Sequence, residues 1–156
     1  MDNAGLAKKL ASLAQLDFDA AQAYNEAAPM VGKSDSEIRE HILLFYEDHK
    51  RHAKTLSDAI SGLGELPPHF SIDIMGYAFE DVTLLLGATG TFGAMIALEQ
   101  NEKLVAQAYA DMLDDSDFSK FPMDVQSIFK AYYDDEKRHL AYIESVLDQI
   151  EPALKK

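Results

Sequence analysis

The strings Asp48-His49-Lys50-Arg51-His52 and Asp135-Glu136-Lys137-Arg138-His139 nearly repeat each other, and they decide how the chain is expected to fold. Asp, Lys, Arg and His recur at identical places, and only the second position differs, His49 against Glu136. Residues three apart share one face of a helix. Each string therefore predicts a helix that presents two metal-ligating side chains in one direction, His49 with His52 and Glu136 with His139.

A second repeat places a carboxylate on each of two further helices. The string Ala21-Gln22-Ala23-Tyr24 recurs as Ala106-Gln107-Ala108-Tyr109. Asp17 and Glu102 each precede their tyrosine by seven residues, which is about two helical turns, so each carboxylate shares a face with its tyrosine. The chain is therefore predicted to form two helical hairpins, each with a carboxylate on its first helix and a paired motif on its second.

Apolar residues at three- and four-residue steps predict four long helices, over residues 3–28, 34–60, 91–113 and 122–150. Ser34 and Glu37 have the spacing of a capping box at the second helix, and the last helix is expected to end before Pro152. Residues 65–90 are long enough to cross a bundle from end to end, with a short helix over 72–86, so the second and third helices run parallel. The prediction is an all-α four-helix bundle with a long crossover, in a single domain over residues 1–156.

The polar residues of the two repeats fall at one depth in these helices. Asp17, His49, Glu102 and Glu136 each lie about eleven to fifteen residues into their helix, which is nearly one level at 1.5 Å per residue. Charged groups at one level of an apolar interior are costly unless they share a ligand. A metal ion is the shared ligand we expect, and the predicted ligands are Asp17, His49, His52, Glu102, Glu136 and His139.

The composition excludes several other classes of protein. The net charge of −13 disfavours nucleic acid and anionic membranes, whose phosphates would be repelled. The absence of cysteine excludes disulfides and iron–sulfur clusters. Residues 82–98 carry no charge, but their three glycines and their flanking acidic residues indicate the end of the crossover and a buried helix start rather than a membrane span. The N-terminus lacks a signal-peptide pattern, so a cytoplasmic protein is expected.

The whole pattern resembles the ferritin-like superfamily, which includes rubrerythrins and bacterioferritins. There, the first and third helices each supply a Glu, and the second and fourth each supply Glu-x-x-His. Within the superfamily the chain is most similar to a bacterial ferritin-like family of unknown function, on the strings at 16–20, 48–52, 63–68, 101–104 and 135–139. Two positions depart from the superfamily pattern. Asp17 stands where Glu is usual, and His49 stands where a Glu usually bridges two metals.

The resemblance implies a metal-binding, diiron-type protein with oxidoreductase activity on Fe(II), O2 or peroxide. Iron is the expected cofactor, with manganese or zinc as other metals that the donor set admits. The alternative is a non-enzymatic metal-binding or stress-associated protein with a vestigial site, and His49 favours it because one neutral imidazole nitrogen binds only one metal. A monomer or small homo-oligomer is expected rather than a cage, because only six residues follow Ile150.

The residues around the ligands have structural as well as functional interpretations. A ligating histidine usually donates its other N–H to a carboxylate, and Asp48 and Asp135 suit this role. The resemblance implies a crossed pairing, Asp48 with His139 and Asp135 with His52, because in the superfamily the Asp of one motif often serves the His of the other. The same contacts could instead satisfy two buried histidines without any metal, and His49 could lie on a helix surface. The hydroxyls of Tyr24 and Tyr109 either serve core packing or hydrogen-bond to the carboxylates.

Overall fold

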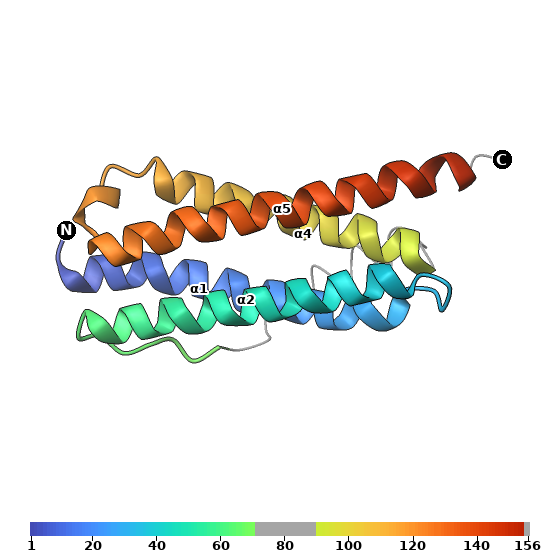
Figure 1. The fold of residues 1–156 in the computed structure, drawn as a ribbon. Coiled ribbons are helices and arrows are strands. Elements are labelled where there is room, and N and C mark those ends of the chain that lie inside the picture. The colour runs from blue at the N-terminus through green and yellow to red at the C-terminus, as the bar shows by residue number, and fades with distance from the viewer. Residues whose placement is uncertain (71–89, 155–156) are drawn as a thin grey trace.

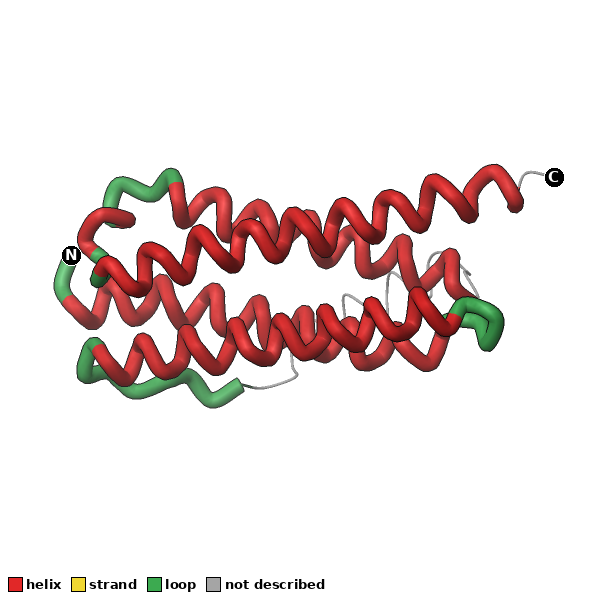
Figure 2. Tube along the Cα trace, viewed as in Figure 1, coloured by secondary structure: helices red, strands yellow, loops and turns green. Residues whose placement is uncertain are grey.

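The fold is an all-helical bundle. In the computed structural model the described residues are 1–70 and 90–154, and this part of the chain contains helices and no strand (Figure 2). The prediction of an all-α four-helix bundle is confirmed. The short helix expected over 72–86 lies outside the described residues. The long helices are α1 (Asn3–Ala27), α2 (Ser36–Gly62), α4 (Gly90–Leu113) and α5 (Met123–Leu154), with short 3-10 helices η1 (Ala28–Met30) and η2 (Phe118–Lys120).

The helices pack as two antiparallel hairpins, α1 with α2 and α4 with α5 (Figure 1). α2 and α4 run in the same direction, so the end of α2 and the start of α4 lie at opposite ends of the bundle (Figure 1). The chain must therefore cross the length of the bundle between them, as the sequence predicts. Phe70 already lies against the first hairpin, because its ring stacks on that of Phe18 with centroids 4.9 Å apart.

The starts of the first two helices differ in how they are capped. The side chain of Asp2 accepts a hydrogen bond from the backbone N–H of Gly5 at 2.9 Å, which satisfies a free donor of the first turn of α1. The capping box predicted for Ser34 is wrong, because Asp35 is the N-cap of α2 and its side chain makes no capping bond within the described chain. The Ser34 hydroxyl instead donates to Asp35 at 3.1 Å, and Thr91 of α4 donates to the other oxygen of Asp35.

The end of α5 also differs from the prediction. The helix was expected to end near Ile150, but it continues through Pro152 to Leu154. A proline removes one backbone donor and disfavours helical backbone at the residue before it. Pro152 lies in the last turn of α5, so its missing N–H removes only one hydrogen bond near the end of the helix. The helix therefore continues past the proline to Leu154.

The apolar core is divided into two clusters by the level that holds the predicted ligands. One cluster includes Leu10, Leu56 and Phe129, and the other includes Ile42 and Leu98, all with at most 1% of their surface exposed. The first cluster draws on the first parts of α1 and α5 and the last parts of α2 and α4, and the second cluster draws on the opposite parts of the same helices. The polar residues between them are therefore shielded from solvent at both ends.

Replacing Phe129 with alanine is expected to destabilise the bundle by about 3–5 kcal/mol, because truncating a buried aromatic ring leaves a cavity. The ring has no exposed surface and packs against the rings of Phe118 and Phe121, at centroid distances of 6.0 and 5.1 Å. Chemical denaturation measures the change. Met123→Ala is the control, since Met123 is 75% exposed and its truncation should cost less than about 0.5 kcal/mol. Equal losses in the two variants would contradict this description of the core.

Candidate metal centre

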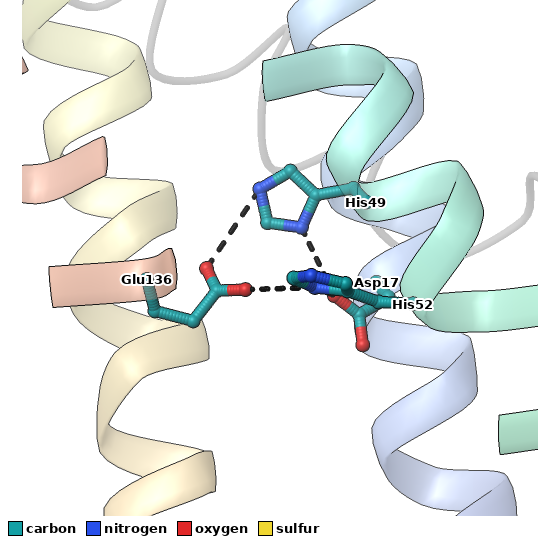
Figure 3. A group of neighbouring side chains, drawn as sticks. All are labelled: Asp17, His49, His52 and Glu136. Atoms are coloured by element: carbon teal, nitrogen blue, oxygen red, sulfur yellow. Dashed lines mark hydrogen bonds and ion pairs between the residues drawn. The ribbon is translucent and has the colours of Figure 1, made fainter. Parts of the chain in front are cut away.

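The structure brings all six predicted ligands together in the middle of the bundle. They come from all four long helices, and none has any exposed surface. The interpretation of His49 as a surface residue is wrong, because its ring lies inside the bundle. Figure 3 shows the carboxylate of Glu136 on α5 reaching toward His49 and His52 on α2, with Asp17 of α1 beside them.

His49 lies at the centre of the cluster and joins the two hairpins. Its Nδ1 is 3.0 Å from Asp17 Oδ1, and its Nε2 is 2.9 Å from Glu102 Oε1. Only a protonated imidazole donates from both nitrogens. Burial lowers the pKa of His49, but the charges of Glu136 and Glu102 and the hydrogen bonds outweigh burial and raise this pKa well above its usual value. Without a metal, His49 is therefore a buried cation between carboxylates.

The other two histidines each turn one nitrogen inward and one outward. The outer Nε2 of His139 lies 3.0 Å from Asp48, and that of His52 lies 3.1 Å from Asp135. These are the crossed contacts that the resemblance to the ferritin-like superfamily implies for the two aspartates. Burial lowers both histidine pKa values, but the neighbouring carboxylates outweigh it and raise the pKa of His139 to about 10 and that of His52 to about 9.

Two arginines that were not predicted as site residues hold these aspartates in place. Arg51 lies 2.8 Å from Asp48 and 3.0 Å from Asp135, and Arg138 lies 2.9 Å and 3.0 Å from the same two carboxylates. Burial raises the pKa of Asp48, but His139 and the arginines lower it well below its usual range. The signal for this role was in the sequence, since both arginines belong to the repeated string.

Two tyrosines hydrogen-bond to the carboxylates of the opposite hairpin. Tyr24 of α1 donates to Glu102 Oε1 of α4 at 2.5 Å, and Tyr109 of α4 donates to Asp17 Oδ2 of α1 at 2.5 Å. Burial and the nearby carboxylates raise both tyrosine pKa values well above the usual range, so the hydroxyls keep their protons. Of the two interpretations of these tyrosines, the structure supports hydrogen bonding to the carboxylates.

Several inward-facing atoms have no hydrogen-bond partner among the described residues. They are Glu102 Oε2, both carboxylate oxygens of Glu136 and His139 Nδ1. The pKa of Glu136 is raised, mainly because the carboxyl group is buried. The charge of His49 lowers this pKa and the charge of Glu102 raises it, but burial is the largest effect. Buried polar atoms without partners are rare because each costs free energy. Four of them aimed at one place indicate that a ligand belongs there.

The donor atoms fit a divalent transition metal. Two overlapping groups each offer one nitrogen or oxygen per residue with all of these atoms within 4.8 Å of one another, and His49 and Glu136 belong to both groups. Imidazole and carboxylate ligands together suit iron, zinc, copper and nickel better than magnesium or calcium. The groups are Asp17, His49, His52 and Glu136, and His49, Glu102, Glu136 and His139.

Solved structures with the same arrangement of helices are ferritin-like proteins. A bacterioferritin-related dodecameric thioferritin from Bacteroides fragilis is 16% identical, with a TM-score of 0.78 over 99% of this chain and 91% of that chain. The bacterioferritin of Desulfovibrio desulfuricans, described with a diiron site, is 18% identical, with a TM-score of 0.75 over 96% of this chain and 82% of that chain. A ferritin-like, diiron-carboxylate protein from Bacillus anthracis is 17% identical, with a TM-score of 0.73 over 94% of this chain and 98% of that chain.

These likenesses establish that the chain has the ferritin-like fold, as the resemblance of its motifs implied. No protein-family model matches the chain, and no curated protein sequence matches it. The likeness to one bacterial ferritin-like family of unknown function therefore stays a prediction. Among the described helices, none combines the length and the apolar character that crossing a membrane requires.

Proposed function

We propose that this chain binds iron in its buried centre and oxidises Fe(II), with dioxygen or peroxide as the electron acceptor. The observation that carries the proposal is the convergence of unpaired donor atoms, from Glu102, Glu136 and His139, inside an otherwise apolar bundle; these atoms find no partner in the described part of the chain. The diiron descriptions of the Bacillus and Desulfovibrio proteins support iron as the metal. They give no support to manganese or zinc.

The residues of this chain would bind and orient the metal. Iron bound here would supply Lewis acidity and one-electron redox chemistry. Asp48 and Asp135 fix the outer nitrogens of the two histidines, so that each ring presents Nδ1 to the interior. Tyr24 and Tyr109 each hold one carboxylate oxygen of Glu102 and Asp17, which fixes the rotation of these groups. The apolar clusters above and below exclude bulk water from the centre.

Anaerobic addition of Fe(II) is expected to raise the melting temperature. A ligand at about 100 times its dissociation constant stabilises the native state by about 2.7 kcal/mol, which is about 5–10 °C for a chain of this length. Subsequent exposure to air should produce a visible absorption band from Fe(III). Glu136→Gln is the control, because it removes the carboxylate shared by both donor groups. An unmoved melting temperature in the unmodified protein would contradict the proposal.

A second candidate function is metal binding without redox activity. His49 favours it, because the ring already pairs with Asp17 and Glu102, and it replaces the carboxylate that would bridge two metals. This candidate predicts the same thermal shift with Fe(II), but no absorption band after air is admitted. The two measurements on one sample therefore separate the two functions.

The assembly of the chain stays a proposal of a monomer or small homo-oligomer. The Bacteroides protein of the same fold is dodecameric, so the fold is compatible with a larger assembly. Light scattering on the purified protein distinguishes a monomer or small homo-oligomer from a larger assembly. A mass near that of twelve chains would overturn the proposal of a small assembly.

A further inference from the structure

We propose that the two halves of the centre are unequal, and that a single ion binds first at Glu102, Glu136 and His139. These ligands belong to α4 and α5, and we call them the α4/α5 half-site. Asp17, His52 and the other oxygen of Glu136 form the α1/α2 half-site, which hydrogen bonds within the protein keep closed. The inference rests on the proposed function only in that the cluster must bind a metal.

The α4/α5 half-site has donor atoms at the spacing that a metal requires. His139 Nδ1 lies 3.7 Å from Glu102 Oε2 and 3.8 Å from Glu136 Oε2. Donors about 2.1 Å from an ion are roughly 3.4 Å apart at tetrahedral angles and slightly farther apart at wider angles. These separations are too long for hydrogen bonds. All three atoms also lack a hydrogen-bond partner within the described residues.

The α1/α2 half-site has its donor atoms at hydrogen-bond distances instead. His52 Nδ1 lies 3.1 Å from Glu136 Oε1 and 3.3 Å from Asp17 Oδ1. His49 Nδ1 lies 3.0 Å from the same oxygen of Asp17 (Figure 3). The protons that His49 and His52 share with Asp17 Oδ1 occupy the space that an ion would need. Glu136 Oε1 makes no hydrogen bond within the described residues, so the contacts of Asp17 are the ones that must separate before a metal binds here.

Asp17 and Glu102 occupy matching places in the two repeats, and their carboxylates show the difference directly. Both oxygens of Asp17 are engaged, Oδ1 with His49 and His52 and Oδ2 with Tyr109. Glu102 has only Oε1 engaged, with Tyr24 and His49. Its Oε2 has no partner in the described chain. The shorter side chain of Asp17 and the position of His49 therefore leave a free oxygen on Glu102 and none on Asp17.

Anaerobic titration with Co(II), whose visible spectrum reports its coordination, tests the inference in the full-length protein. We expect one tightly bound ion per chain. His139→Ala should weaken its binding by at least about 100-fold, since even the partners of ligands are worth about 10–100-fold. The matched variant His52→Ala should change the affinity by less than about tenfold, because His52 belongs to the closed half-site. Melting curves of the two metal-free variants establish that both are folded.

Proton NMR of the unmodified Co(II) protein gives a readout that does not depend on the variants folding. The ring N–H that faces Asp48, on His139, should show a large paramagnetic shift at one equivalent of metal, and the ring N–H of His52 should be less affected. Two ions bound with equal affinity, or equal losses in the two variants, would overturn the inference and leave the proposed function intact. No binding of Co(II) or Fe(II) by the unmodified protein would overturn both.

Discussion

Replacing His49 with glutamate is expected to raise the metal content from one ion per chain to two. The variant would carry the string Asp-Glu-Lys-Arg-His on α2, the same string as residues 135–139 on α5. A carboxylate at position 49 can bind two ions, one with each oxygen, whereas each nitrogen of His49 now lies against a carboxylate oxygen. Removal of the ring also frees Asp17 Oδ1 from one of its hydrogen bonds, so the α1/α2 half-site should open.

The same substitution should destabilise the metal-free protein. His49 is a cation between Asp17, Glu102 and Glu136, and the variant replaces it with a fourth carboxylate in a fully buried cluster. Breaking a buried ion pair costs about 3–5 kcal/mol, because the remaining charge has no partner. Added metal should recover this loss and more, since two ions then bind the native state. The unfolding free energy with and without Fe(II), together with elemental analysis, measures both effects.

His49→Gln separates the loss of the imidazole from the gain of a bridging carboxylate. It removes the positive charge without supplying a second anionic oxygen, so we expect it to bind one ion per chain. Two ions in both variants would show that the ring of His49 blocks the second ion and that no bridging carboxylate is needed. One ion in His49→Glu, in a protein shown to be folded, would contradict the expected opening of the α1/α2 half-site.

The fold and the members of the cluster followed from the sequence because they depend on periodicity and spacing. The paired strings place His52 and His139 on two helices, and the tyrosine strings place Asp17 and Glu102 on the other two. Equal depth along four helices then brings these side chains to one level. The long connection between α2 and α4 follows from its length and its breaking residues alone.

The difference between the two half-sites could not be predicted from the sequence. It depends on small differences in the distances between side chains of different helices, 3.1 and 3.3 Å in one half-site against 3.7 and 3.8 Å in the other. The repeats treat Asp17 and Glu102 as equivalent, yet only Glu102 keeps an oxygen without a partner in the described chain. The prediction of a capping box at the start of α2 failed for a similar reason, since the N-cap is Asp35 and its side chain makes no capping bond within the described chain. Thr91, far along the chain, competes for Asp35, and local spacing does not reveal such a contact.

The stability of the metal-free protein is expected to fall as the pH rises from about 7 to 10. The folded protein raises the pKa of His52 to about 9 and that of His139 to about 10, above about 6.5 for an unfolded histidine. Stabilisation from a raised histidine pKa is fully present below the unfolded pKa, and it is lost as the pH rises through the folded pKa. The loss should be on the order of a few kcal/mol, measured by denaturant unfolding with a chelator present.

Bound metal should cancel part of this pH dependence, the part that comes from His139. A metal ligates only a ring nitrogen without a proton, so the affinity rises with pH as His139 loses the proton on Nδ1. The stabilisation by Fe(II) should therefore be smallest near pH 6 and grow toward pH 8, while the metal-free protein weakens. His139→Gln is the control, because it removes the group that couples protons to the metal, and its metal-free stability should depend less on pH. A metal-free protein whose stability is constant from pH 7 to 10 would show that carboxylates, and not these histidines, carry the protons in the cluster.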